Sequence, residues 1–294
     1  MKHILKLVVP ALSIAFIAGF VFAHPATAGY EKIAYEPAPA PYAVDRQRKL
    51  ALRYDVYAGG FRALNASLVM DLDKKAYDMA LKAETQGFIG TLFPWKATFN
   101  TAGHANTKGA LIPTIHTERS SWREKVSFKE MSYGPTGKIL KTTTQSNGKT
   151  TTDRDINDVL SGRAVDVLTG ALTMLQTANK NQKCTGKFPV FDGKRRYNIT
   201  LSDNGTEILP PSRYSSFQGE AMRCTITVEP VAGFVAKDAK RGWMAVQNHT
   251  AERNKPPILW LARMKETGQV VPVRMEIAST YGSVVAHLSG GTHN

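Results

Sequence analysis

The chain has few cysteines, few acidic residues and, after its N-terminus, no long apolar run. Only two of its 294 residues are cysteine, which excludes a small fold held together by many disulfides. No apolar run beyond the N-terminal segment approaches the ~20 residues of a membrane-spanning helix, so a polytopic membrane protein is also excluded. The apolar content of 43% excludes a disordered chain.

Catalytic and metal-binding motifs are missing as well. Gly-x-Ser-x-Gly and Cys-x-x-Cys do not occur, and the Ser-x-x-Lys match at 146–149 falls in an Asn-Gly turn instead of at a helix start. Among the five histidines that follow residue 28, no two have metal-ligand spacing, and each is expected to be an exposed or hydrogen-bonded surface residue: His104, His116, His249, His287 and His293. We expect no catalytic residue, no metal site and no cofactor. A polysaccharide hydrolase needs only two carboxylates and stays open as an alternative.

The N-terminus has the pattern of an export signal. Lys2 and Lys6 precede an apolar run from Leu7 to Phe22, which is followed by a small-x-small motif ending at Ala28. This predicts a cleavable signal peptide over residues 1–28, cut after Ala28. A retained membrane anchor is disfavoured because the run is short and contains Pro10. No transmembrane segment is expected after removal of the signal.

Basic residues outnumber acidic ones, 38 against 24. Because the signal contains two lysines and no acidic residue, its removal lowers the formal charge from +14 to +12. In an exported protein such charge faces lipid head groups and cell-wall polymers instead of nucleic acid. We therefore expect an anionic envelope surface or the cell wall as a partner, and no nucleic acid.

A proline-rich linker separates the signal from the folded part. Residues 29–47 contain Pro37, Pro39 and Pro41 on alternate positions, which favours extended polyproline geometry. No second break of this kind and no internal repeat follows. We predict one β-rich domain over residues 48–290 and a short tail at 291–294.

In this domain, apolar and polar residues mostly alternate, with a period of two. Apolar residues alternate with polar ones over 64–72 and again over 77–83, and the polar turn 73–75 between them completes a hairpin signature. Similar strand patterns are separated by turn sequences at 134–137, 146–149 and 203–205. We predict a mainly β protein with a single antiparallel curved sheet, or a barrel-like, half-open fold.

Two segments depart from this period. One apolar helical stripe, with Asp166 near its N-terminal end, predicts a helix over 165–178. The stripe consists of Val165, Leu168, Leu172 and Leu175. The apolar stretch 88–95 lacks alternation. It is either a loop or short helix that closes one end of the sheet, or a hydrophobic lip that touches membrane or ligand, formed by Phe88, Leu92, Phe93 and Trp95.

The two cysteines form the clearest chemical pair. Cys184 and Cys224 have no other partner in a chain that carries an export signal, and an oxidising compartment favours their disulfide. Cys224 shares a strand face with Ile226 and Val228, so it should point inward. We expect a buried structural disulfide.

A basic segment lies between the cysteines. Asp192-Gly193 predicts a turn, and Arg195 is in phase with Tyr197 on the face that its strand should bury. A buried arginine needs a carboxylate, such as Asp192, or an anionic ligand. Four residues are candidates for contact with that anion: Lys194, Arg195, Arg196 and Tyr197.

Several of these stretches resemble one known family. Residues 54–72, 85–95, 190–201, 227–234 and 259–280 are similar to the exported bacterial family called domain of unknown function 3108, over the chain from about Leu52 to Leu288. The resemblance implies a periplasmic cell-envelope protein of a Gram-negative bacterium without an established activity. A looser likeness is to periplasmic β-rich proteins that hold lipids or lipoproteins in a half-open barrel.

We expect a non-enzymatic periplasmic protein that binds a lipid, a lipoprotein, an acyl chain or an apolar peptide inside its curved sheet and supports envelope integrity. A binder or hydrolase directed at peptidoglycan is the first alternative. A structural scaffold for other envelope proteins is the second.

Overall fold

A computed structural model describes residues 49–73, 75–235, 255–279 and 282–293. The expected signal peptide with its cleavage site at Ala28, and the expected linker, lie outside the described residues. The last strand continues to His293, so most of the expected C-terminal tail is part of the sheet.

Within the described residues, fourteen strands form one antiparallel sheet in the order β8-β7-β6-β5-β4-β3-β2-β1-β14-β13-β12-β11-β10-β9. The strands are β1 Lys49–Ala58, β2 Phe61–Leu72, β3 Ala76–Thr85, β4 Trp95–Ala105, β5 Leu111–Trp122, β6 Lys125–Tyr133, β7 Ile139–Ser146, β8 Lys149–Asp153, β9 Gly186–Phe191, β10 Arg196–Leu209, β11 Gly219–Ala232, β12 Ile258–Arg263, β13 Val270–Ser279 and β14 Gly282–His293. The sheet is not closed, since β8 and β9 are its two edges.

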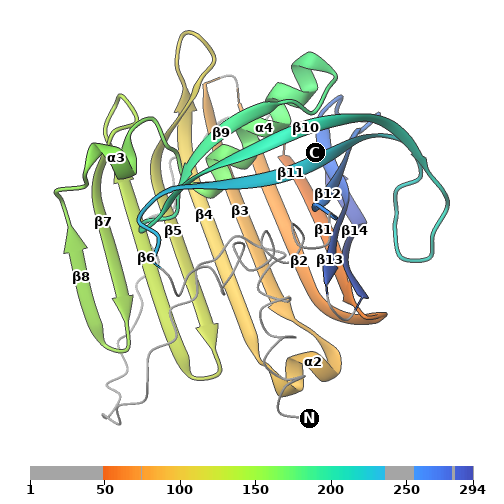
Figure 1. Cartoon of the computed structure of the whole chain (residues 1–294), viewed down its shortest axis with the longest axis horizontal. Helices are drawn as coiled ribbons and strands as arrows, with labels where there is room; N and C mark the ends of the chain where they lie inside the picture. The colour runs from red at the N-terminus through yellow and green to blue at the C-terminus, as the bar shows by residue number, and fades with distance from the viewer. Residues whose placement is uncertain (1–48, 74, 236–254, 280–281, 294) are drawn as a thin grey trace.

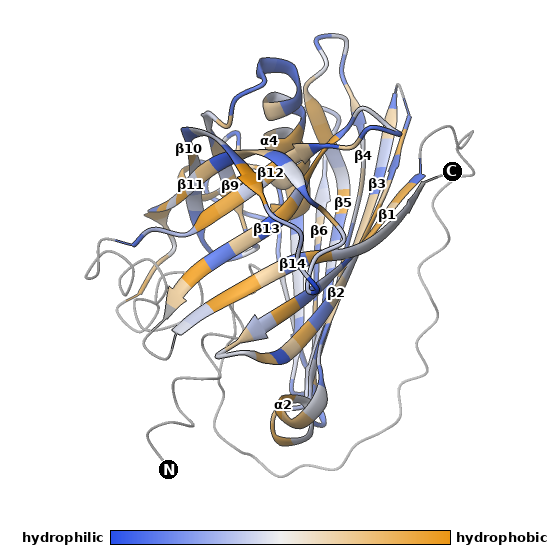
Figure 2. Cartoon of the chain, turned by 90° about the vertical axis from the view of Figure 1, so that its right-hand side faces the viewer, coloured by the Kyte–Doolittle hydropathy of each residue, from blue (hydrophilic) through white to orange (hydrophobic). Residues whose placement is uncertain are grey.

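The sheet folds back over itself around one helix. Figure 1 shows β1–β8 as a broad layer, with β9, β10 and β11 passing across its face, and Figure 2 shows the two layers from the side with α4 between them. Edge strand β9 is partly covered, because Val165 forms a parallel bridge to Val190. The predicted curved, half-open β-fold is confirmed.

Cross-strand pairs of apolar residues explain the register. In the β2–β3 hairpin, Leu68 faces Leu81 and Met70 faces Met79. A shift by one residue would turn this apolar set out of the core, so one register is strongly preferred. The predicted hairpin about residues 73–75 is confirmed.

The sequence 203–205 is a bulge instead of the predicted turn. Strand β10 runs through it, with Asp203 opposite Cys224 and Thr206 opposite Met222. Gly205 has a φ of +76°, a left-handed conformation that a bulge can use as readily as a turn. Pairing with β11 on both sides of the bulge keeps the strand continuous.

Three helices are described: α2 Gly87–Leu92, α3 Asp158–Ser161 and α4 Val167–Asn181. Asp166 is the N-cap of α4, and its carboxylate accepts hydrogen bonds from the amides of Leu168 and Thr169. The predicted helix is confirmed, with its first turn two residues later than expected. No described helix is long and apolar enough to cross a membrane.

Candidate functional site

An apolar cavity of about 220 Å³ lies beside α4, inside the curl of the sheet. Three strands of the first half of the domain and five of the second contribute to its wall, together with the helix. The apolar side chains that the sheet supplies are Leu68, Met79, Leu81, Ile199, Leu201, Ile226, Val228, Leu259, Leu261, Pro272, Met275 and Ala286. Residues more than two hundred positions apart therefore share one internal surface.

Helix α4 supplies one side of the cavity through an apolar stripe. Leu168, Ala171 and Leu175 lie at the spacing of a single helical face, and all three line the cavity. Leu168 and Leu175 are buried. The short side chain of Ala171 between them leaves space that a larger residue would fill.

Gly170, which precedes Ala171 on the helix, is tightly packed. A Cβ atom added at Gly170 would lie 2.9 Å from the Cγ2 atom of Val190 on β9. The cavity is therefore confined to one side of the helix, and the side that faces β9 has no free space.

Three of the residues that line the cavity carry polar side-chain groups: Tyr54, Tyr197 and Arg274. The Tyr54 hydroxyl donates to the carbonyl oxygen of Pro272 at 3.0 Å. The Tyr197 hydroxyl is buried without a hydrogen-bond partner. Burial raises the pKa of Tyr197 well above its ordinary value, so this hydroxyl stays protonated.

Arg274 lies at the border between the cavity and solvent. Its guanidinium stacks over the Trp260 ring at 4.7 Å, and its Nη2 atom lies 2.7 Å from the Glu276 carboxylate. Its Nε atom is buried and has no hydrogen-bond partner. Because Glu276 balances its charge, Arg274 adds little net positive charge beside the cavity but keeps one buried hydrogen-bond donor unused.

A buried polar network holds the N-terminal end of α4. Thr169 Oγ1 donates to Asp166 Oδ2 at 2.7 Å, and Thr101 Oγ1 donates to Asp166 Oδ1 at 2.8 Å. His116 Nδ1 lies 3.1 Å from the same Oδ1 atom. The hydroxyl of Tyr77 extends the network to Thr169 at 2.8 Å. These five residues, called the polar anchor below, join β3, β4 and β5 to the helix.

The carboxylate of Asp166 stays ionised in this network. Complete burial alone would raise its pKa, but His116 and the hydrogen bonds from Thr169 outweigh burial and lower the pKa below its ordinary value. The prediction that His116 lies at the surface is wrong, since only 3% of the residue is exposed. Its partners are far apart in the sequence, and no local pattern connects them.

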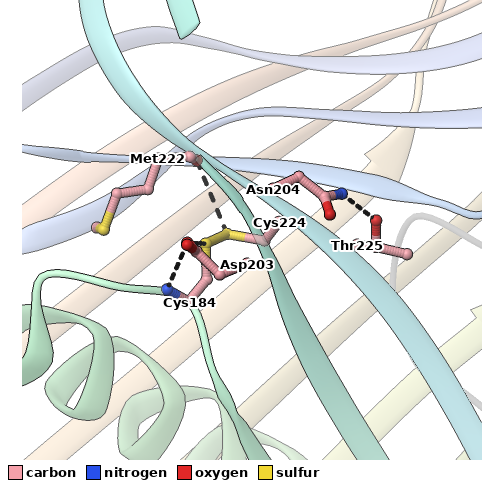
Figure 3. Close-up of a disulfide and its surroundings, with 6 residues drawn as sticks. All are labelled: Cys184, Asp203, Asn204, Met222, Cys224 and Thr225. Atoms are coloured by element: carbon pink, nitrogen blue, oxygen red, sulfur yellow. Dashed lines mark hydrogen bonds between the residues drawn. A yellow bond between two sulfur atoms is a disulfide. The ribbon is translucent and has the colours of Figure 1, made fainter. Parts of the chain in front are cut away.

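The disulfide between Cys184 and Cys224 holds the other end of α4 (Figure 3). Cys184 follows the helix, Cys224 lies on β11, and both are fully buried. The amide of Cys184 donates to Asp203 Oδ1 at 3.3 Å, beside the bulge in β10. The predicted buried disulfide is confirmed, and it ties the end of α4 to strands of the cavity wall.

The basic segment lies where the two layers of the sheet meet. Arg195 pairs with Asp192 at 2.7 Å, the carboxylate that the sequence had offered as its partner. Lys129 on β6 donates to the Asp192 carbonyl at 2.6 Å and pairs with Glu118 at 3.0 Å. Burial acts to lower the pKa of Lys129, but Glu118 and Asp192 together raise it, so the lysine is charged.

The other candidate anion contacts do not converge on one point. Lys194 is exposed at the tip of the β9–β10 turn, and Arg196 donates to the Val159 carbonyl at 3.0 Å. Tyr197 lines the apolar cavity. The structure thus gives Arg195 and Arg196 partners within the protein and places Tyr197 apart from them.

The stretch 88–95 forms α2 and the start of β4 at one end of the sheet. Phe88 is 73% exposed and Leu92 is 39% exposed, whereas Phe93 and Trp95 are buried. Of the two alternatives for this stretch, the short helix at one end of the sheet is present as α2, and the four-residue lip is wrong in that Phe93 and Trp95 point into the core. In the described part of the chain, no group of three histidine, cysteine or acidic side chains could hold a metal ion.

The fold and the cavity define an open, curled β-sheet protein with one internal helix and an apolar cavity beside it. A family model described as "Protein of unknown function (DUF3108)" matches residues 53–289, and the chain therefore belongs to this family.

A search of curated proteins gives no match. Among solved structures, the chain is similar to a "Beta-barrel-like Protein of Domain of Unknown Function DUF1849 from Brucella abortus". The two sequences are 13% identical, the TM-score is 0.46, and the similarity covers 85% of this chain and 99% of that chain.

Proposed function

We propose that this protein is an exported, non-enzymatic component of the cell envelope that binds one apolar chain, such as an acyl chain, in the cavity beside α4. The observation that carries the proposal is the 220 Å³ cavity with its nearly uniform apolar wall. The cavity is partly open, so a guest can enter it, and pockets that bind small ligands are lined mainly by apolar side chains of this kind. Apolar cavities stay dry and accept apolar guests.

The volume favours a single chain over a two-chain lipid. Ligand pockets for drug-sized molecules usually enclose about 300–1,000 Å³, and a cavity of about 150 Å³ accepts a benzene ring. By that comparison, this cavity of 220 Å³ has space for roughly eight to ten carbon atoms. A medium-length acyl chain, or the end of a longer one, is the guest that fits.

The border residue Arg274 supports a guest with an oxygen atom at one end. Its unpartnered Nε–H group can donate to a carbonyl or carboxylate oxygen of the guest. The nearby Glu276 carboxylate disfavours a ligand that brings a high negative charge. A fatty acid or an ester-linked acyl chain satisfies both conditions.

The absence of enzymatic activity is part of the proposal. The buried histidine and aspartate that could form a catalytic pair, His116 and Asp166, instead hold the start of α4. Export to the periplasm is supported by the N-terminal sequence pattern, and the buried disulfide suits an oxidising compartment.

Calorimetric titration with decanoate tests the proposal. The wild-type chain should bind it with a negative heat-capacity change, as expected for burial of apolar surface. Ala171→Leu, which fills the cavity, should weaken binding at least about tenfold, whereas Gln176→Leu, on the exposed side of the same helix, should not. Equal affinity in the two variants, or no binding by the wild type, would refute the cavity as the ligand site.

A second observation favours the alternative of a wall-directed binder. A polar depression of about 600 Å³ crosses β1–β4 and β14, and its basic residues are Arg53, Arg62, Lys82 and Lys96. Co-sedimentation with purified peptidoglycan tests this alternative. Lys82→Glu combined with Lys96→Glu should abolish retention if the depression binds the polymer, and unchanged retention would remove it as the binding surface.

A further inference from the structure

The end of the molecule that carries α2 exposes an unusual amount of apolar side chain. Phe61, the first residue of β2 after the β1–β2 turn, is 73% exposed, as is Phe88, and Leu92 is 39% exposed. These three residues are called the aromatic tip. The amide of Gln86 donates to the carbonyl of Ala63 at 2.9 Å, so the turn and the helix lie side by side. Figure 1 shows α2 beyond the ends of the strands.

The fold does not account for the aromatic tip. Helix α2 has no buried residue. The two following aromatic side chains, Phe93 and Trp95, are buried and fix this segment to the sheet without help from Phe88. Two phenylalanines that are mostly exposed and adjacent contribute little to folding, and such patches on a protein surface mark contact with a partner or a membrane.

Basic residues surround the aromatic tip. Arg62 follows Phe61 directly, the turn between β5 and β6 contributes exposed Arg123, and exposed Lys125 begins β6. The amide of Arg123 donates to the Pro94 carbonyl at 2.9 Å, which places this turn beside the end of α2. Three carboxylates oppose this charge: Glu124 is exposed in the same turn, Asp55 pairs with Arg62 at 3.1 Å, and exposed Glu84 accepts from the side chain of Gln86 at the start of α2. Exposed Lys96 lies opposite Glu84 on β4 and adds a fourth basic residue. Positive charge is in modest excess.

We propose that the aromatic tip docks on the surface of an anionic phospholipid bilayer. The side chains of Phe61, Phe88 and Leu92 enter the interfacial layer, and Arg62, Arg123 and Lys125 approach the head groups. Because the excess of positive charge is small, apolar insertion contributes most of the binding, and anionic lipid strengthens it. This surface is separate from the cavity, and its role does not depend on a ligand bound there.

Vesicle flotation of the mature, full-length chain tests the proposal, with vesicles of phosphatidylglycerol and phosphatidylethanolamine. Phe61→Ser combined with Phe88→Ser should lower the partition coefficient at least about tenfold. Ile208→Ser is the matched control, because Ile208 is 78% exposed but lies on β10. Arg123→Glu combined with Lys125→Glu should lower partitioning by about two- to tenfold and remove the preference for anionic lipid.

Three results would overturn the proposal: no partitioning of the wild type, equal partitioning of the double serine variant, or an equal loss in Ile208→Ser. Sedimentation of the lipid-free chain separates docking on lipid from self-association. If the two phenylalanines changed only the oligomeric state, the aromatic tip would be a contact between copies of the chain and the proposal would fail. All substituted side chains are exposed, so near-ultraviolet circular dichroism should show intact folding.

Discussion

The start and the middle of helix α4 are stabilised in opposite ways. At the start, both carboxylate oxygens of Asp166 accept hydrogen bonds, and the polar anchor connects the helix to three strands. In the middle, Ala171 borders a cavity that no side chain of the described residues fills. Directional hydrogen bonds specify where the helix lies, while incomplete packing one turn later leaves space for a guest. The helix can thus keep its position without a fully packed core.

Replacement of Asp166 by alanine should produce the largest loss of stability. It leaves His116, Thr101 and two backbone amides without their acceptor, and breaking a buried pair of this kind costs about 3–5 kcal/mol. Urea unfolding followed by circular dichroism measures the loss. Asp166→Asn, which retains an acceptor oxygen, should cost less, and a loss below about 1 kcal/mol for alanine would contradict the role of the anchor.

Removal of the disulfide should have the next largest effect. Cys184→Ser combined with Cys224→Ser frees a loop with a sequence separation of 40, and such cross-links contribute about 2–4 kcal/mol. The end of α4 should also become more mobile, so its amides should exchange hydrogen faster than those of its first turn. Uniform exchange along the helix would show that the disulfide does not position it.

The adjacent positions Gly170 and Ala171 should respond in opposite directions. Gly170→Ala places a methyl group against Val190 and should destabilise the protein by about 1 kcal/mol despite the better helix propensity of alanine. Ala171→Leu should stabilise it by about 1 kcal/mol by filling the cavity. Thermal unfolding of both variants is sufficient, and destabilisation by Ala171→Leu would mean that the space is already filled.

The pH dependence of stability should give the smallest effect. The folded-state pKa of Asp166 lies below its unfolded value of about 3.9, so its contribution is present above that value and is lost as pH falls through the folded pKa. The free energy of unfolding of the wild type should therefore fall more steeply below about pH 4 than that of Asp166→Asn. Parallel curves for the two proteins would contradict the lowered pKa.

The sequence predicts the parts of this molecule that repeat locally. Period-two patterns identify the strands, the stripe from Val165 to Leu175 identifies α4, and an isolated cysteine pair in a chain with an export-like N-terminal pattern identifies the disulfide. These signals depend on neighbours within one strand or one helix, which a single sequence contains.

The parts that the sequence does not predict depend on contacts between distant strands. Whether Asp203–Gly205 is a turn or a bulge is decided by pairing with β11 on both sides of it. The burial of His116 follows from its place opposite Thr101 on β4 and from the capping of α4 by Asp166. The cavity depends on the way in which the two layers curl, and no local pattern carries that information.

A crystal structure determined under xenon pressure would test the contrast between the polar anchor and the cavity most directly. Xenon enters dry apolar cavities without needing a particular chemical group. In wild-type crystals we expect xenon density between Ala171 and the strands β10–β12 and no xenon density at the polar anchor. In Ala171→Leu crystals we expect no xenon density in the cavity. An unoccupied or side-chain-filled space beside Ala171 in the wild-type protein would contradict it.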